Sequence, residues 1–256
     1  MSKNARQQQI LQVVETIQEL HLRDLRKRIA ASDATIRRDL RELAAKGQLG
    51  YSHGLIRRRS HYSLEKTFHE KSEVATAEKL AIARAASELI EDGDVVLIGA
   101  GTTAAYLARQ LSQKHIEVWT NSLLVAEELA DAPTVKVHLS GGDVRGAIRA
   151  LVGSRAERFF AGLRAPYAFL SANGFTAERG LSTPNHAVAE VDRALSRAAV
   201  EIVALLDHTK VGEESLIATV PTSRISQLIT DDQAAESVLN EARHIGVSVR
   251  VIETAN

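Results

Sequence analysis

The stretch from Ala100 to Thr103 combines small residues with two hydroxyl groups, at a point where a predicted strand is followed by a predicted helix. Small residues leave backbone amides accessible and a helix N-terminus attracts anions, so this stretch is suited to holding a phosphate group. Glycine and threonine are also common where helices begin. The sequence therefore leaves two interpretations of Gly101, Thr102 and Thr103 open, a phosphate-binding loop and an ordinary helix start.

Residues 32–46 are predicted to form a helix with a cationic outer face. Ile36, Leu40 and Leu43 recur at the spacing of one helix face and are expected to be buried, and Ser32 is a candidate N-cap. Arginine can pair with guanine through two hydrogen bonds, threonine can contact a thymine methyl group, and serine can bind a phosphate. The side chains of this helix that we expect to contact DNA are Ser32, Thr35, Arg37, Arg38 and Arg41.

Two further helices and a hairpin complete the predicted DNA-reading head. Apolar residues at helical spacing predict one helix over residues 6–21 and a short, strongly cationic one over residues 22–30. Residues 48–58 place a Ser-His-Gly turn between two short strands, which predicts a two-stranded wing with His53 as a further DNA contact. Residues 1–59 are therefore predicted to be a winged helix-turn-helix domain.

The charge of the chain is unevenly distributed, although its net value is zero. Lys and Arg outnumber Asp and Glu by 13 to 6 in residues 1–59, and are outnumbered by 26 to 19 in the remainder. A basic head on an acidic body is expected when only the head binds nucleic acid, and a solvated basic surface is the alternative. Asp39 would repel DNA if it were exposed on the cationic helix, so we expect it to pair with a neighbouring arginine.

Arg6, Ile10 and Val14, followed by the run Ser-Asp-Ala-Thr-Ile-Arg-Arg-Asp-Leu at residues 32–40, resemble the signature of the DeoR family of transcriptional regulators. The resemblance implies that residues 32–46 form the helix that reads DNA. It favours sequence-specific binding over a three-helix domain with a coincidental pair of arginines.

From residue 77 onward, predicted helices alternate with predicted apolar strands. This alternation predicts a largely parallel α/β sheet, in which ligands bind where loops meet at the carboxyl ends of the strands. Residues 60–76 lack clear periodicity and are expected to be a linker, which makes residues 77–256 the second domain. The predicted strands are residues 95–99, 117–120, 135–139, 167–171, 201–206, 227–230 and 247–252.

The second domain also resembles the DeoR family along nearly its whole length, including the motif Ala-Glu-Lys-Leu-Ala-Ile-Ala around Lys79. The family's sensor domain is similar in fold to ribose-5-phosphate isomerase and CoA transferases, and the resemblance implies a sugar-phosphate effector. It assigns Gly101, Thr102 and Thr103 to the phosphate and Lys79 to the same pocket, while a solvated helix lysine is the alternative for Lys79. The other residues expected at the effector site are Asn121, Ser122, Gly141, Gly142, Arg149, Asn173 and Lys210.

Several positions depart from the family's pattern. Tyr51 and Leu55 replace an Arg and a Gly of the wing motif, so the wing is expected to contact DNA differently from the family's pattern. Asn173 stands where the family often has Asp, and Asp192 stands where it often has Lys. If Asp192 faces the ligand, it is expected to discourage a second anionic group there.

An enzyme of sugar-phosphate metabolism with an accessory DNA-binding head is the alternative function. Isomerisation requires a base that moves a proton, and the amide of Asn173 cannot serve as one. Glu190 and His186 could still act as bases. We nevertheless expect a regulator rather than an enzyme, because the head matches its family closely.

Composition narrows the remaining possibilities. The chain has no cysteine, which excludes disulfide bonds, thiolate zinc sites and cysteine nucleophiles. No apolar run reaches the roughly 18 residues of a membrane span and no signal-peptide pattern precedes the first helix, so a cytoplasmic protein is expected. His61 and His69 lack partners at metal-ligand spacing and are expected to be surface residues, so no metal or cofactor is assigned.

The predicted function is therefore a sequence-specific transcriptional regulator, a repressor of a carbohydrate-utilisation operon that a phosphorylated sugar or sugar alcohol releases from DNA. Its expected partners are a double-stranded operator, that effector, and further copies of the chain in a dimer or tetramer that spans a two-part operator. A nucleoid-type structural binder would need no base-reading arginines, so Arg37 and Arg38 argue against it.

Overall fold

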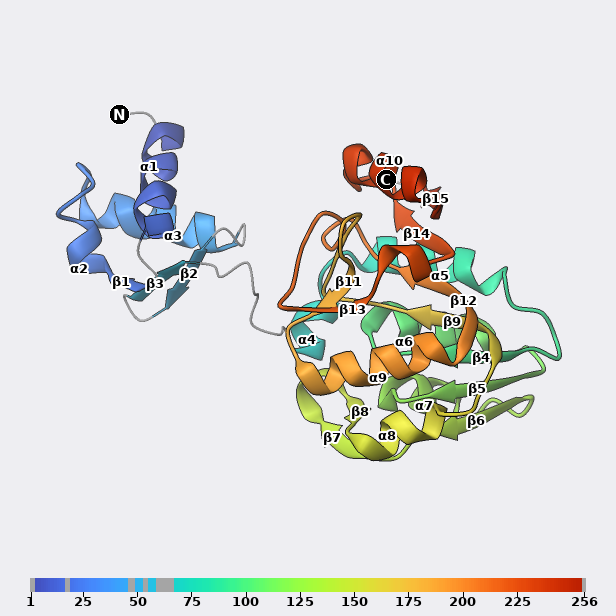
Figure 1. Cartoon of the computed structure of the whole chain (residues 1–256). Helices are drawn as coiled ribbons and strands as arrows, with labels where there is room; N and C mark the ends of the chain where they lie inside the picture. The colour runs from blue at the N-terminus through green and yellow to red at the C-terminus, as the bar shows by residue number, and fades with distance from the viewer. Residues whose placement is uncertain (1–2, 17–18, 46–48, 53–54, 59–66, 255–256) are drawn as a thin grey trace. The chain divides into compact units, whose positions relative to one another are not determined.

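The computed structural model of the chain describes residues 3–16, 19–45, 49–52, 55–58 and 67–254. The chain divides into two units, Met1–Tyr62 and Ser63–Asn256, each with its own core (Figure 1). Among the described residues, no helix combines the length and the apolar character that crossing a bilayer requires.

The first unit is a winged helix-turn-helix, as its sequence predicts. Its helices and sheet enclose one apolar core, in which Ile36, Leu40 and Leu43 are 0%, 0% and 1% exposed and so form the predicted buried stripe. The described elements are α1 (Lys3–Thr16), β1 (Glu19–His21), α2 (Leu22–Leu25), α3 (Asp33–Ala45), β2 (Leu49–Ser52) and β3 (Leu55–Arg58).

Two predicted helices of this unit are shorter than expected. The first was expected to reach His21, but the described part of α1 ends at Thr16 and Glu19–His21 is strand β1, which pairs antiparallel with β3. The wing sheet therefore has three strands, in the order β1-β3-β2. Helix α2 ends at Leu25 instead of continuing to Ala30, and turns follow it. Leu20 and Ile29 are nevertheless buried in the apolar core of this unit.

The second unit is built on a seven-stranded parallel sheet, in agreement with the predicted fold. Its strand order is β15-β14-β12-β9-β4-β5-β6, so β4, β9 and β12 lie at its centre. Adjacent residues of these strands point to opposite faces, and each face carries its own apolar core. The strands are β4 (Val95–Ile98), β5 (Ile116–Thr120), β6 (Val135–Leu139), β9 (Ala165–Leu170), β12 (Ala199–Leu205), β14 (Gln227–Asp231) and β15 (Ser248–Ile252).

Helices cover both faces of this sheet. One core includes residues of α5 (Thr76–Ser87), α6 (Thr102–Leu111) and α7 (Leu123–Leu129). The other includes residues of α8 (Ser154–Phe160), α9 (His186–Arg197) and α10 (Glu236–Ile245), and α9 crosses in front of the sheet in Figure 1. Burial on both sides explains why the strands appear in the sequence as continuous apolar runs.

Short elements that the sequence analysis did not anticipate complete this unit. The antiparallel pair β7 (Asp143–Arg145) and β8 (Ala150–Val152) flanks a 3-10 turn at Gly146–Ile148. A second small sheet joins β10 (Gly174–Thr176), β11 (Gly180–Thr183) and β13 (Ile217–Val220), and a further 3-10 turn spans Thr222–Arg224.

Helix α4 (Phe68–Ser72) lies within residues 60–76, which were expected to be the linker. Thr67 caps this helix, since its hydroxyl accepts a hydrogen bond from the amide of Glu70 while the Glu70 carboxylate accepts one from the amide of Thr67. The capping motif was visible in the sequence, but a helix of five residues is too short to show periodicity.

Candidate DNA interface and effector pocket

The exposed side of α3 carries the residues predicted to contact DNA. Ser32 caps the helix, because its hydroxyl accepts a hydrogen bond from the amide of Thr35 at 3.3 Å. The two hydroxyl oxygens of Ser32 and Thr35 lie 2.8 Å apart. Both hydroxyls therefore lie at the N-terminus of α3, where a helix attracts an anion such as a phosphate.

The three predicted arginines of α3 are all exposed, and they differ in how they are held. Arg37 donates a hydrogen bond to the Asp33 carboxylate at 3.1 Å and another to the Tyr51 hydroxyl at 3.4 Å. The bond to Asp33 raises the pKa of the Arg37 guanidinium. Within the described part of the chain, the side chains of Arg38 and Arg41 form no hydrogen bond or ion pair. These two guanidinium groups are therefore exposed and available to pair with base edges.

Asp39 is fully buried and pairs with an arginine, as predicted, but the partner comes from a different helix. The Arg6 Nε atom of α1 lies 2.5 Å from the Asp39 carboxylate, and the Gln7 amide group lies 3.4 Å from it. This hydrogen bond raises the pKa of Arg6. Asp39 therefore fixes α3 against α1 instead of repelling DNA at the surface.

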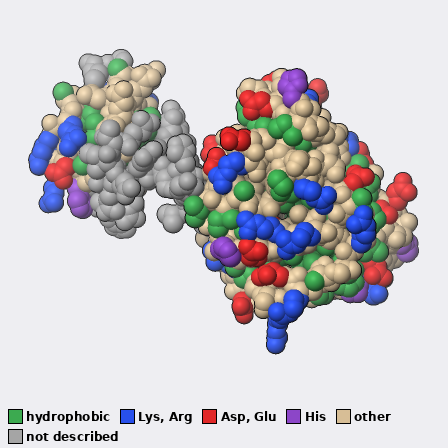
Figure 2. All heavy atoms as spheres, viewed as in Figure 1, with side chains coloured by type: hydrophobic (Ala, Val, Ile, Leu, Met, Phe, Trp, Pro, Cys, Tyr) green, Lys and Arg blue, Asp and Glu red, His purple; other side chains and the backbone are tan. Residues whose placement is uncertain are grey.

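A second exposed basic cluster surrounds α2. Figure 2 shows Lys and Arg side chains gathered over this part of the first unit. Such a surface is suited to phosphate contacts, which strengthen binding without selecting a sequence. The exposed basic residues here are Arg23, Arg26, Lys27 and Arg28. His53 of the predicted wing tip lies outside the described residues.

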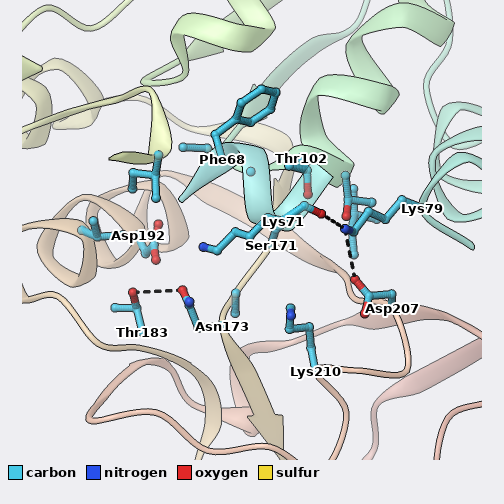
Figure 3. Close-up of a pocket in the computed structure, with 17 residues that line it drawn as sticks. Phe68, Lys71, Lys79, Thr102, Ser171, Asn173, Thr183, Asp192, Asp207 and Lys210 are labelled. Atoms are coloured by element: carbon cyan, nitrogen blue, oxygen red, sulfur yellow. Dashed lines mark hydrogen bonds and ion pairs between the residues drawn. The ribbon is translucent and has the colours of Figure 1, made fainter. Parts of the chain in front are cut away.

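In the second unit, a pocket opens at the carboxyl ends of the central strands β4, β9 and β12 (Figure 3). Helices α4 and α9 and the N-terminus of α6 complete its walls. Six of the predicted effector residues line it, namely Lys79, Gly101, Thr102, Thr103, Asn173 and Lys210. The other lining residues are Phe68, Lys71, Ala100, Ile148, Ser171, Ala172, Thr183, Val188, Asp192, Leu205 and Asp207.

The loop between β4 and α6 has the form expected of an anion site. Thr102 and Thr103 begin α6, whose first amides have no partner within the helix. A Cβ atom at Gly101 would lie 2.9 Å from the Cβ of Ser171, so this close approach requires glycine. The buried Ser171 hydroxyl has no hydrogen-bond partner among the described residues. An unpartnered hydroxyl beside a helix N-terminus indicates a site for a polar ligand.

Lys79 is buried, so the solvated alternative for this residue is wrong. Only 3% of its surface is exposed, and its ammonium group donates hydrogen bonds of 2.5 Å to the carbonyl oxygens of Lys71 and Val74. The Asp207 carboxylate lies 3.9 Å from the same ammonium group. Lys79 thus ties the end of α4 to α5 and places a cation at the pocket wall.

The opposite wall contains Asp192, Asn173 and Thr183 (Figure 3). The Thr183 hydroxyl lies 3.4 Å from the Asn173 side-chain oxygen. Asp192 is only 8% exposed, and burial raises the pKa of its carboxyl group to about 8, although Lys71 and Arg193 act in the other direction. This wall therefore presents hydroxyl, amide and carboxyl groups in place of a cluster of cations.

Asn121 and Ser122 do not line the pocket. They follow β5, which lies on the side of β4 away from β9 and β12. Both are buried: the Asn121 amide donates to the carbonyl of Leu151 at 3.1 Å, and the Ser122 hydroxyl caps α7. Their contacts are structural.

Gly141, Gly142 and Arg149 also lie outside the lining. A Cβ atom at Gly142 would lie 2.5 Å from the carbonyl oxygen of Val152, so close packing accounts for this glycine, and Gly141 has a positive φ of 65°. The Arg149 guanidinium carbon lies 4.9 Å from the ring centre of Phe68, so Arg149 supports a lining residue from behind.

The candidate bases of the enzyme alternative are absent from the pocket lining. Glu190 accepts a hydrogen bond of 2.5 Å from Arg193. His186 lies 3.6 Å from the same carboxylate and is exposed. Neither residue is placed to move a proton on a ligand held by α6. Among the described residues, no group of three or more His, Asp or Glu side chains could hold a metal ion.

The sequence analysis missed several lining residues. Phe68 and Lys71 were assigned to the linker, and only recognition of the Thr67 cap could have placed them in the domain. Ser171 and Asp207 follow β9 and β12, where the strand-end rule could have suggested them. Thr183 belongs to the small sheet that was not predicted.

The comparisons with known proteins match both units. Residues 6–61 match the DeoR-like helix-turn-helix domain, and residues 74–232 match the DeoR C-terminal sensor domain. The HTH-type transcriptional regulator GolR of Listeria innocua is 30% identical over 252 residues, which cover 97% of this chain and 98% of the relative. The lactose phosphotransferase system repressor of Staphylococcus aureus strain N315 is 32% identical over 241 residues, covering 93% and 96%.

Two solved structures are similar to parts of the chain. Ribose 5-phosphate isomerase A from Methanocaldococcus jannaschii has a TM-score of 0.41 and 18% identity, over 54% of this chain and 55% of the isomerase chain. The translation initiation factor eIF-2B from Pyrococcus horikoshii has a TM-score of 0.42 and 12% identity, over 89% and 82%.

A winged helix-turn-helix that matches a DNA-binding domain family, joined to a unit that matches a sensor domain, defines a DNA-binding transcriptional regulator, not an enzyme. Both domains and full-length relatives agree on its family. The chain belongs to the DeoR family.

Proposed function

We propose that the protein represses a carbohydrate-utilisation operon and that a phosphorylated sugar or sugar alcohol releases it from the operator. The observation that carries the effector proposal is the Ser171 hydroxyl, which is buried and unpartnered among the described residues beside the N-terminus of α6. The relatives supply the context, since one of them is named as a repressor of a lactose phosphotransferase system.

In this proposal the phosphate occupies the β4–α6 loop. The backbone at Gly101 and the first amides of α6 donate hydrogen bonds to it, as do the hydroxyls of Thr102 and Thr103. Lys210 lies on the same side of the pocket as Asp207 and contributes positive charge (Figure 3). Asn173 faces the sugar hydroxyls. Asn121, Ser122, Gly141, Gly142 and Arg149 act indirectly, by supporting the pocket.

On the DNA side, Arg38 and Arg41 read base edges in the major groove, and Ser32, Thr35 and Arg37 bind phosphates or neighbouring bases. Tyr51 holds Arg37 at 3.4 Å, which assigns a positioning role to the residue that replaces the wing arginine of the family. Two copies of the head, in a dimer or tetramer, occupy the two halves of the operator.

Helix α4 couples the two sites. Phe68 and Lys71 face the pocket, and the chain before Thr67 continues through residues 59–66 to the head. An effector that contacts these two side chains changes the position of α4 and with it the geometry of the heads. By linkage, the operator must weaken effector binding by the same factor as the effector weakens operator binding.

The test begins with selection of an operator from random duplexes by the purified full-length protein. Binding to the selected duplex is then titrated by fluorescence anisotropy, with a panel of phosphorylated sugars and sugar alcohols. The unphosphorylated form of each compound is its matched control. We expect at least one phosphorylated compound, and none of its controls, to weaken operator binding; a panel without any effect contradicts the effector proposal.

A further inference from the structure

Arg37 differs from the other exposed arginines of α3, because side chains from two separate elements hold its guanidinium group. Its Nε atom donates a hydrogen bond of 3.1 Å to Asp33 in the first turn of α3, and one of its terminal nitrogens donates a hydrogen bond of 3.4 Å to the Tyr51 hydroxyl of β2. A guanidinium group has five N–H donors, so three remain. No further hydrogen bond from Arg37 is found in the part of the chain that the structure describes. The remaining donors are therefore available to DNA.

The two groups that hold Arg37 are themselves fixed. Tyr51 packs against the apolar core of the head and pairs with Ile56 in the wing sheet, so its hydroxyl has a defined position. Arg26 Nε lies 3.5 Å from the second carboxylate oxygen of Asp33. The side chain of Arg37 is 44% exposed, yet these partners restrain it before DNA arrives. Ordering it on a base therefore costs less conformational entropy than ordering an unrestrained arginine.

This arrangement favours a base edge over a phosphate as the partner of Arg37. The Asp33 carboxylate offsets the positive charge of Arg37 and would repel a phosphate placed beside it. A base edge has no net charge, so it escapes this repulsion. Guanine presents two neighbouring acceptors in the major groove, O6 and N7, which match two N–H donors of a planar guanidinium group. Adenine presents an acceptor beside a donor there, so it cannot accept both hydrogen bonds.

We propose that Arg37, held by Asp33 and Tyr51, selects a guanine in each half of the operator, with Tyr51 as the positioning residue. The inference rests on the proposed function, in which α3 enters the major groove, and it narrows the partner of Arg37 to one base. Tyr51 stands where the wing of the family has an arginine. An arginine has no acceptor, so it could not receive the hydrogen bond from Arg37. The positioning is therefore a property of this chain.

The experiment uses the full-length protein and the operator selected from random duplexes. Each guanine of the operator is replaced in turn by 7-deazaguanine, which lacks the N7 acceptor and still pairs with cytosine. Dissociation constants are measured by fluorescence anisotropy at several salt concentrations, for the wild type, Arg37→Ala and Tyr51→Phe. The matched control is Tyr106→Phe, which removes the same hydroxyl group from α6 of the sensor domain, outside the pocket lining. Circular dichroism checks the folding of each variant.

We expect one guanine in each half of the operator at which 7-deazaguanine weakens binding of the wild type and of Tyr106→Phe about tenfold, the effect of one hydrogen bond to a charged donor. Arg37→Ala should bind the two duplexes equally. Tyr51→Phe keeps the arginine without its restraint, so the loss should fall to about threefold, while its affinity for random duplexes stays that of the wild type. The salt dependence of Arg37→Ala should change by clearly less than the roughly one unit that a lost phosphate contact produces.

Three results overturn the inference while operator binding stands. The first is a wild type that tolerates 7-deazaguanine at every position. The second is a loss of equal size in Arg37→Ala, or an equal weakening of this variant on all duplexes with a salt dependence lower by about one unit, which identifies a phosphate contact. The third is a Tyr51→Phe variant that discriminates as the wild type does. A wild type that selects no operator at all contradicts the proposed function itself, so the two failures are distinguishable.

Discussion

Replacing Asp192 by Asn should make the sensor domain more stable than the wild type near pH 8, and the difference should vanish in acid. The ordinary pKa of an aspartate is near 3.8, whereas burial raises the pKa of Asp192 in the folded protein to about 8. Between these two values, the folded state keeps a proton that the unfolded state has lost. The stability associated with this proton is therefore fully present below pH 4, decreases steadily as the pH rises, and is lost once the pH has passed through 8.

The size of the effect follows from the window between the two pKa values. Each pH unit within it changes the free energy of unfolding by at most about 1.4 kcal/mol for one proton. The window from 3.8 to about 8 then sets an upper limit of roughly 6 kcal/mol. Asn has nearly the shape of a protonated Asp and does not ionise, so the variant does not lose stability in this window. Its free energy of unfolding, relative to that of the wild type, should therefore increase steadily from pH 4 to 8.

Urea unfolding followed by tryptophan fluorescence isolates this effect. The chain has one tryptophan, Trp119, on β5 of the sensor domain, so its signal does not report on the head. Trp119 stacks on His138 with ring centres 4.1 Å apart, so its signal reports on packing within the sensor domain. The quantity to compare is the difference in unfolding free energy between wild type and Asp192→Asn at each pH. A difference that is constant from pH 5 to 8 would refute the assignment of a neutral carboxyl group to the empty pocket.

Three further changes separate the roles of the two units. Arg38→Ala should weaken binding to the selected operator by about 1–3 kcal/mol and relax the protein's base preference, measured by fluorescence anisotropy on operator variants. An equal loss of affinity on every sequence would show that Arg38 contacts phosphate only. Thr102→Val should leave operator affinity unchanged and abolish release by the effector, and unaltered release would remove the β4–α6 loop from the phosphate site. Lys79→Met should also abolish release of the operator by the effector, because it removes the hydrogen bonds to the carbonyls of Lys71 and Val74 that hold α4. Circular dichroism checks that this variant folds, and a normal response to the effector would contradict the role of α4 in coupling.

The central elements of both units were predictable because long buried runs dominate their sequences. Strand β6 has the predicted bounds, and β4 ends one residue earlier than predicted. The stripe of α3 was likewise visible in the helical spacing of its apolar residues. Elements of three to five residues, such as β1 and α4, are too short for periodicity to identify, and tertiary pairing decides their conformation.

The composition of the pocket could be predicted only in part, because the sequence does not give the order of strands in a sheet. The strand-end rule was applied equally to the loops after β4, β5, β6, β9 and β12. In the structure, β5 and β6 lie toward one edge, so the loops that carry Asn121 and Gly141 are displaced from the central crevice. Residues after β4, β9 and β12 converge there, which accounts for both the correct assignments and the missed Ser171 and Asp207.

In the proposed function, α4 couples the pocket to DNA binding, and the way in which α4 is held suits this role. None of the residues of α4 is fully buried, so the helix is not anchored by a core of its own. It is held by the Thr67 cap, by the hydrogen bonds from Lys79, and by contact of Phe68 with Arg149. Contacts of this kind are individually modest, of the order of 1 kcal/mol each. A ligand that bridges Lys71 and the opposite wall therefore needs only a modest preference for one position of α4 to shift its population, and α4 is the first described element that follows the head along the chain.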